Sequence, residues 1–360
     1  MTATEQNSAE ATYDESAATH RSALRMGIVL GVISSLGYTL ANLALRQMAA
    51  PDESVGEISE FAWAVWVTAM KAVPAAVVAW VLIGIRVRQK LPALPPRELV
   101  GKMILAALLM QYGGNLCFQL SLTLGGLAIS VPLCFATLIV AGAWLGRVFL
   151  GDPVSFRTMC SIGVLGVSIV FLTMGAGSAT TAMKEDATTL TLVAAVATAS
   201  FSGISYGACG VMIRKLTQDL SLSASLVIFS SVGVVTLIAH TFLLADPTAI
   251  LNATREWWLP MLASGSFNAI AFFAVAGALK RIPVTFVNVL NTSQNAMCAL
   301  AGVLLFREPL TSPLVIGCGL TIVGLLLVDS GKKPVMETSI EGSGSSVELS
   351  PDHDAAEELV

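Results

Sequence analysis

Residues 148–155 read VFLGDPVS, and a segment of the same pattern, LLFREPLT, occupies residues 304–311. Each segment has apolar residues followed by an acid, a proline, an aliphatic residue and a hydroxyl residue. Upstream, GGLAIS at 125–130 and KRIPVT at 280–285 precede the two segments at nearly the same distance. The matched positions predict that the chain contains two related units.

The sequence around these segments is apolar enough to lie in a membrane. The chain has 360 residues, of which 55% are hydrophobic and 12% charged, and its mean hydropathy is +0.76. A soluble domain carries roughly 25% charged residues, and a helix needs ~20 residues to cross ~30 Å of hydrocarbon. We therefore expect an all-α polytopic membrane protein with about ten transmembrane helices, at approximately 26–48, 61–85, 103–122, 125–146, 157–176, 188–212, 222–243, 257–279, 283–305 and 312–330.

The expected spans divide into two five-helix repeats, residues 26–176 and 188–330, joined by a linker at 177–187. Because each unit has an odd number of spans, the second must be inverted relative to the first, as in many secondary transporters. Residues 1–25 and 331–360 are polar and poor in aromatic residues, so we expect disordered tails, the second of them acidic. Some neighbouring spans are separated only by tight connections, such as TLGG at 123–126 and LKRI at 279–282, and there the sequence defines the ends of the helices least precisely.

Basic residues predict the orientation of the spans. Most lysines and arginines fall in segments that share one side of the membrane if the N-terminus is cytoplasmic. Lys and Arg are retained on the cytoplasmic side of short loops. The pattern favours an integral protein of the cell (inner) membrane, with both termini in the cytoplasm.

The sequence resembles a known family over about residues 26–330. The two acid-Pro-aliphatic-hydroxyl turns (GDPVS and REPLT), a basic residue in the second span (Lys71) and a proline early in the fourth (Pro132) are similar to the drug/metabolite transporter superfamily, in particular its EamA-type members. Asp152 stands where this family usually has Glu, and Lys71 where an Arg is common. The resemblance implies proton- or gradient-coupled transport of small metabolites, often outward, and implies no particular substrate.

Polar side chains recur at helical spacing inside several spans, as in FVNVLNTSQNAM at 286–297. Facing lipid, each amide would lose its hydration without replacement, at a cost of several kcal/mol. Interhelical hydrogen bonds explain an isolated Asn equally well, but stripes in both units favour a central aqueous cavity. The predicted lining residues, from four spans, are Tyr38, Asn42, Gln111, Asn115, Gln119, Tyr206, Asn288, Asn291 and Asn295.

Lys71 is the sharpest single candidate because it lies near the middle of the second span. An ammonium there costs about 2.5–3.5 kcal/mol on insertion scales. It either extends toward the interface or is satisfied by carbonyls and amides, or it binds an anionic group of the substrate. No span interior holds an Asp or Glu, which disfavours export of cationic drugs by proton exchange and favours neutral or anionic, amino-acid-like solutes.

Three further features are typical of structural roles. Asp152 and Glu308 precede prolines at expected helix starts, where carboxylates cap helices. Gly203 and Gly207 form a small-xxx-small pair that permits close helix packing. The six cysteines lie in apolar runs and read as small buried hydrophobes.

The functional prediction is a secondary transporter that exports a small polar metabolite by alternating access. A channel or a non-transporting receptor or scaffold remains the alternative. An intramembrane enzyme is disfavoured, since the sequence offers no nucleophile-base pair, paired carboxylates or metal motif within the spans. We expect no cofactor and no nucleic-acid partner; the expected partners are a small-molecule substrate, the bilayer and a coupling proton or ion.

Overall fold

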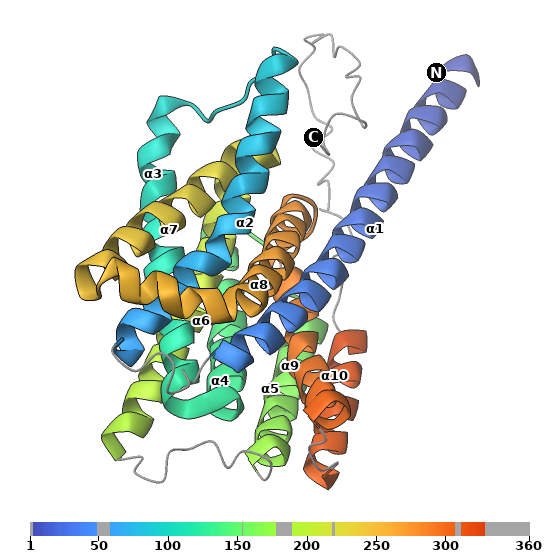
Figure 1. Ribbon diagram of the computed structural model, residues 1–360. Coiled ribbons are helices and arrows are strands. Elements are labelled where there is room, and N and C mark those ends of the chain that lie inside the picture. The colour runs from blue at the N-terminus through green and yellow to red at the C-terminus, as the bar shows by residue number, and fades with distance from the viewer. Residues whose placement is uncertain are drawn as a thin grey trace.

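The computed structural model describes residues 3–48, 58–152, 154–177, 189–217, 220–306 and 311–327. Over these ranges the only regular secondary structure is helical (Figure 1). The elements are α1 Ala3–Met48, α2 Glu60–Arg88, α3 Arg97–Leu108, the π-helix η2 Leu109–Leu116, α4 Cys117–Leu150, α5 Phe156–Gly177, α6 Thr189–Thr217, α7 Leu222–Leu244, α8 Pro247–Arg281, α9 Val284–Phe306 and α10 Ser312–Leu327. The expected all-α class is confirmed for these residues.

Many of these helices are long and apolar enough to cross a membrane. By length and composition there are seven such segments in the described ranges, at Arg21–Leu45, Glu60–Arg88, Arg97–Leu124, Leu133–Leu150, Val193–Leu216, Leu222–Leu244 and Trp257–Arg281. Two shorter apolar helical segments, Phe156–Phe171 and Ser312–Leu327, accompany them. Large apolar side chains such as Trp80, Leu243 and Leu326 are exposed on the outside of the bundle, where lipid would cover them. The chain is an integral membrane protein.

The N-terminal segment differs from the prediction of a disordered tail at 1–25. Helix α1 already begins at Ala3, and its first turns project from the bundle (Figure 1). Residues 3–25 contain Ala and Glu and neither Gly nor Pro, so the backbone can continue the apolar helix upstream. The predicted linker at 177–187 and tail at 331–360 lie, apart from Gly177 at the end of α5, outside the described residues.

The structure places a reversal of the chain at one of the expected tight connections. Helical hydrogen bonding runs from Cys117 to Leu150 in α4, but the hydroxyl oxygens of Ser121 and Ser130 lie 2.6 Å apart. Nine residues of straight helix are about 13 Å long, so α4 bends back on itself around TLGG at 123–126, between the candidate spans that end at Leu124 and begin at Leu133. The boundary at LKRI is confirmed, since α8 ends at Arg281 and α9 begins at Val284.

Small side chains bring the helices close together. A Cβ atom on Gly203 of α6 would lie 2.1 Å from the Cys134 carbonyl oxygen of α4, and one on Gly207 would lie 2.8 Å from the Gly142 nitrogen. The predicted packing role of Gly203 and Gly207 is therefore confirmed. Between α5 and α10 the hydroxyl group of Ser161 donates to the Gly324 carbonyl oxygen at 2.6 Å. These contacts hold the helices around a central space.

Candidate functional site

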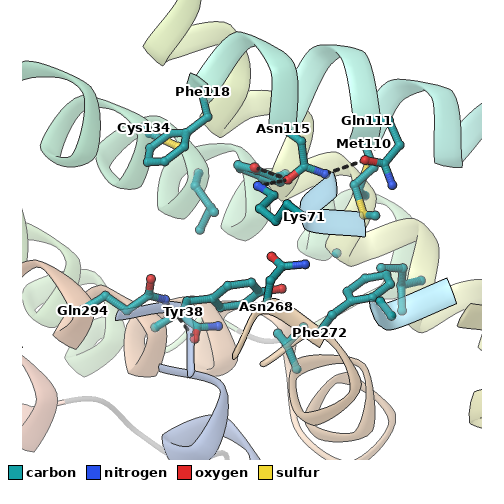
Figure 2. Close-up of a pocket in the computed structure, with 18 of the residues that line it drawn as sticks. Tyr38, Lys71, Met110, Gln111, Asn115, Phe118, Cys134, Asn268, Phe272 and Gln294 are labelled. Atoms are coloured by element: carbon teal, nitrogen blue, oxygen red, sulfur yellow. Dashed lines mark hydrogen bonds between the residues drawn. The ribbon is translucent and has the colours of Figure 1, made fainter. Parts of the chain in front are cut away.

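A cavity of about 140 Å³ opens between the N-terminal helices α1, α2, η2 and α4 and the C-terminal helices α6 to α9 (Figure 2). Its polar lining residues are Tyr38, Asn42, Lys71, Gln111, Asn115, Tyr206, Ser230, Asn268, Asn288, Asn291 and Gln294. At 10–15 Å³ for each water-sized group, the cavity holds on the order of ten such groups. A small metabolite fits this space.

One wall of the cavity carries a chain of hydrogen bonds that begins at Lys71. The Lys71 ammonium group donates to Asn115 Oδ1 at 2.8 Å, and the Tyr206 hydroxyl group donates to the same oxygen at 2.8 Å. Asn115 Nδ2 donates to Gln111 Oε1 at 2.8 Å, and Gln111 Nε2 donates to the Phe229 carbonyl oxygen at 3.0 Å. Each link joins a donor to an acceptor in the same direction along the chain.

The backbone end of this chain fixes the orientation of both amides. A carbonyl oxygen only accepts, so Gln111 must turn its NH2 group toward Phe229 and its oxygen toward Asn115. Asn115 must then turn its oxygen toward Lys71. An ammonium group has three N–H donors, and Asn115 takes one of them. The other N–H groups of Lys71 remain available to the cavity.

The π-helix η2 places Gln111 and Asn115 on this wall. A π-turn inside an α-helix is rare and is frequently found at functional sites. Its glycines allow α6 to come close: a Cβ on Gly114 would lie 2.7 Å from Cε1 of Tyr206, and one on Gly113 would lie 2.6 Å from Oγ of Ser205. The Ser202 hydroxyl group also donates to the Gly114 carbonyl oxygen at 2.8 Å. Tyr206 thereby reaches Asn115.

The opposite wall carries uncharged polar groups. Figure 2 shows Tyr38, Asn268 and Gln294 on this side of the space, facing Lys71 and Asn115. The Ser34 hydroxyl group donates to Asn291 Oδ1 at 3.1 Å, and Gln294 Nε2 reaches the same oxygen at 3.3 Å. Within the described part of the chain, the side chains of Tyr38 and Asn268 form no hydrogen bond. These groups are open to a solute.

Apolar side chains close the cavity between the two polar walls. The larger ones are Met110, Phe118, Phe135, Leu138, Phe272 and Leu279. Ligand pockets are typically lined by apolar and aromatic groups with a small number of polar groups that fix orientation. This arrangement suits a solute with one polar end and an apolar body.

Most of the residues selected from the sequence meet at this cavity. Tyr38, Asn42, Lys71, Gln111, Asn115, Tyr206, Asn288 and Asn291 line it. Gln119 and Asn295 are buried but do not line it. Gln119 lies in α4, past the π-helix that ends at Leu116.

Sequence reasoning missed Asn268, Gln294 and Ser230, which also line the cavity. Asn268 is an isolated amide in an apolar span, and the desolvation argument used for the other amides would have selected it. Gln294 and Asn295 both follow Asn291 by one helical turn, so periodicity alone does not choose between them. Ser230 carries no sequence signal, because its hydroxyl group can bond to the preceding turn, as it does to Leu226 at 2.8 Å.

An ionic cluster lies near one end of the cavity, next to the lining residues Ile213 and Leu279. Arg214 Nη2 of α6 lies 3.2 Å from Asp152 Oδ1, after the end of α4. Asp152 Oδ2 accepts from the Val284 N–H group at 3.1 Å, and Arg214 Nη1 donates to the Ile282 carbonyl oxygen. Asp152 was expected to cap the helix that follows it; instead it caps α9, because the α4–α5 connection brings it to the Val284 N–H group. Glu308 lies outside the described residues.

The architecture and the cavity define a class of protein: an all-α membrane protein whose helices enclose a solute-sized polar space. Residues 193–329 match the model of the EamA-like transporter family. The chain therefore carries an EamA-like transporter domain, and this family is part of the drug/metabolite transporter superfamily. The resemblance seen in the sequence is confirmed for this part of the chain. The family consists of membrane transporters and is typically non-enzymatic, which implies a small-molecule substrate.

Two further comparisons concern the fold and the curated proteins. A crystal structure described only as that of a protein superposes with a TM-score of 0.62, covering 84% of this chain and 95% of that chain at 14% identity. At that identity the similarity shows the fold alone. No curated protein matches the sequence.

Proposed function

We propose that the protein is a secondary transporter that exports a small polar metabolite, neutral or anionic and preferably amino-acid-like, by alternating access. The observation that carries this proposal is the cavity itself, which helices of both halves of the chain line. Its described lining residues include one buried cation, Lys71, among amides. The coupling species in this proposal is a proton or another ion.

The architecture in this proposal is ten spans in two inverted five-helix repeats, residues 26–176 and 188–330. The packing partners support it. If α1 to α5 correspond to α6 to α10, the contact of α4 with α6 corresponds to that of α9 with α1, and α1 with α8 corresponds to α6 with α3. Exchanging the two repeats swaps α2 with α7 and α5 with α10, so the α2–α7 contact and the α5–α10 contact are each unchanged by the exchange. A two-fold exchange of inverted repeats produces this set of contacts.

The proposed location is the cell (inner) membrane, with both termini in the cytoplasm. The distribution of Lys and Arg between the connections supports this orientation. On that assignment the Asp152–Arg214 cluster lies at the cytoplasmic end of the cavity, because Arg214 is in the last turn of α6.

The test is solute exchange in proteoliposomes preloaded with labelled amino acids, organic acids, nucleosides or sugars, measured as loss of label into a medium that contains the same unlabelled solute. We expect saturable exchange of one class, which Asn115→Ala and Asn291→Ala each reduce at equal protein incorporation. The matched control is Asn252→Ala, at an exposed position of α8 outside the cavity. Non-saturable flux would indicate a channel, and absence of flux would indicate a receptor or scaffold. Normal exchange in both cavity variants would exclude the amides from the transport site.

A further inference from the structure

Among the described residues that line the cavity, one carries a positive charge and none is acidic. Lys71 is buried, with 7% of its surface exposed, and it is the sole residue among the described cavity-lining side chains that carries a charge at neutral pH. Its hydrogen-bond partner is the neutral Asn115 Oδ1. A buried ammonium without a counter-charge is costly, so an anion bound beside Lys71 would be stabilised.

The hydrogen-bond chain gives Lys71 one acceptor within its own wall. Asn115 Oδ1 already accepts from both Lys71 and Tyr206. The amide groups of Asn115 and Gln111 direct their N–H donors away from Lys71, toward Gln111 and Phe229. A carboxylate has two oxygens that accept from an ammonium group. A carboxylate is the simplest group that accepts hydrogen bonds from the remaining Lys71 N–H groups and also neutralises the positive charge of Lys71.

A second positive charge has no such partner in the cavity. The ammonium group of an amino acid would face Lys71 and the amides, with no carboxylate among the described lining residues to receive it. Amide oxygens solvate a cation less well than water does, and like charges in a low dielectric repel strongly. A hydroxyl group in place of the ammonium avoids both costs, since Tyr38 and Asn268 have free donors and acceptors.

We propose that the substrate is a monocarboxylate without an ammonium group, such as a 2-hydroxy acid with an apolar side chain, held by its carboxylate on Lys71. Its hydroxyl group bonds to the wall that carries Tyr38 and Asn268, and its apolar body packs against Phe118, Phe135 and Phe272. This inference rests on the proposed function and narrows its solute class from amino-acid-like compounds to acids of net charge −1.

The test compares three molecules of one skeleton on the purified full chain in detergent: 2-hydroxy-4-methylpentanoate, leucine and 2-hydroxy-4-methylpentanamide. Binding is measured from ligand-dependent thermal stabilisation, which rises with occupancy. We expect the hydroxy acid to bind at least about tenfold more tightly than leucine and than the amide, since both lose the charge balance. A second series, phenyllactate and phenylalanine, should show the same order.

Lys71→Gln is the decisive variant, and Lys102→Gln is its matched control, because Lys102 is exposed on α3 outside the cavity. We expect the preference for the hydroxy acid to disappear in Lys71→Gln and to persist in Lys102→Gln. If Lys71→Gln does not fold, the comparison of the three molecules on the native chain still decides. Equal or tighter binding of leucine or of the amide, or no binding of the hydroxy acids, would overturn the inference.

Flux in proteoliposomes separates this inference from the proposed function. Hydroxy acids that bind with the expected preference but are not transported would refute the carrier and leave the site assignment standing. Saturable transport of other solutes, without preference for the hydroxy acids, would support the carrier and refute the assignment of a carboxylate to Lys71.

Discussion

At the scale of single residues, Asn115 sets the chemistry of the cavity. Its oxygen receives two donors, from Lys71 and Tyr206, and its amide nitrogen is held by Gln111. A neutral acceptor at this position orients Lys71 without cancelling its charge. The difference between an amide and a carboxylate at residue 115 therefore decides whether an anionic solute is needed.

Asn115→Asp tests this role directly. The Asp carboxylate would take the place of the Asn115 amide, whose Oδ1 is 2.8 Å from the Lys71 nitrogen. It would therefore supply the negative charge that balances Lys71. We expect the affinity for carboxylates to fall by at least about tenfold, measured by thermal stabilisation with 2-hydroxy-4-methylpentanoate. Asn252→Asp, exposed on α8, should bind as the native chain does. Unchanged affinity in Asn115→Asp would mean that Lys71 does not hold the anion.

Asn295 is a buried amide without a recorded role. It has 5% of its surface exposed, and in the described structure neither its oxygen nor its nitrogen has a hydrogen-bond partner. A buried polar group without partners costs ~1–3 kcal/mol. We expect Asn295→Leu to keep or raise the melting temperature and to leave solute binding unchanged. Asn291→Leu, which loses the Ser34 bond, should reduce binding; a loss of binding in Asn295→Leu would assign that amide to the site.

At the scale of elements, the contact between α4 and α6 holds Tyr206 at the wall that carries Lys71 and Asn115. Gly203 and Gly207 remove side chains at the points where the backbones approach most closely. The π-turn at Leu109–Leu116 then presents Asn115 to Tyr206 of α6. Helix packing and the local π-geometry are both required for the chain of hydrogen bonds.

Gly203→Ala should weaken this contact. The added Cβ would lie 2.0 Å from Thr137 Oγ1 and 2.1 Å from the Cys134 carbonyl oxygen, so the backbones must separate. Overpacking of this kind costs ~1–3 kcal/mol and should lower the melting temperature in detergent. Gly163→Ala on α5 is the control, because a Cβ there has no atom within 4 Å. Equal melting temperatures would show that the contact is not tight.

Asp246 provides a pH-dependent helix start outside the membrane-spanning segments. The Thr248 hydroxyl group and the N–H groups of Thr248 and Ala249 donate to its carboxylate at the start of α8. These bonds lower the pKa of Asp246, led by the Thr248 hydroxyl group. Because the folded pKa lies below the ordinary value of 3.8, the stabilisation is present above that value and is lost as the pH falls through the folded pKa.

Asp246→Asn and Asp246→Ala separate the charge from the cap. Asn is as good an N-cap as Asp and does not titrate in this range. We therefore expect Asp246→Asn to keep the melting temperature at neutral pH and to lose this residue's share of the acid sensitivity. Asp246→Ala should melt lower at neutral pH. Melting curves of the three proteins from neutral pH to below 3.8 test this; identical acid profiles for native chain and Asp246→Asn would contradict it.

At the scale of the whole molecule, an ionic cluster links the N-terminal helices to the C-terminal ones at the end of the cavity near Ile213. The cluster of Asp152, Arg214, Ile282 and Val284 joins the end of α4 to α6 and to the α8–α9 connection. Asp152 has 7% and Arg214 19% of the side chain exposed, so water screens the pair only partly. Alternating access would require this end to open and the cluster to break.

Asp152→Asn should favour opening at this end. It removes the ion pair while keeping an oxygen that can accept from Val284. The readout is the reaction of Cys209, which lines the cavity, with a small maleimide in a variant with no other cysteine. We expect labelling to be several-fold faster than in the same background with Asp152. Arg147→Gln, an exposed residue near the same end of α4, is the control; equal labelling rates would show that the cluster does not restrict access.

The sequence by itself determined the class of protein and the direction in which its polar groups face. Apolar runs of span length leave helices as the available structure, because no other open segment satisfies its backbone in hydrocarbon. The same cost of desolvation placed Lys71, Asn115 and Asn291 inside the protein before any contact was known. These conclusions need only local composition and helical periodicity.

Only the tertiary structure decided which buried polar groups share one cavity. Gln119 and Asn295 fit the periodic pattern but lie off the cavity, while Asn268 and Gln294 line it. Helical periodicity fixes the face of one helix, but the neighbour of that face depends on how the helices pack and on the π-turn at Leu109–Leu116. The caps show the same limit: Asp152 serves α9, which is distant in sequence, because tertiary packing brings the Val284 N–H group within hydrogen-bond distance.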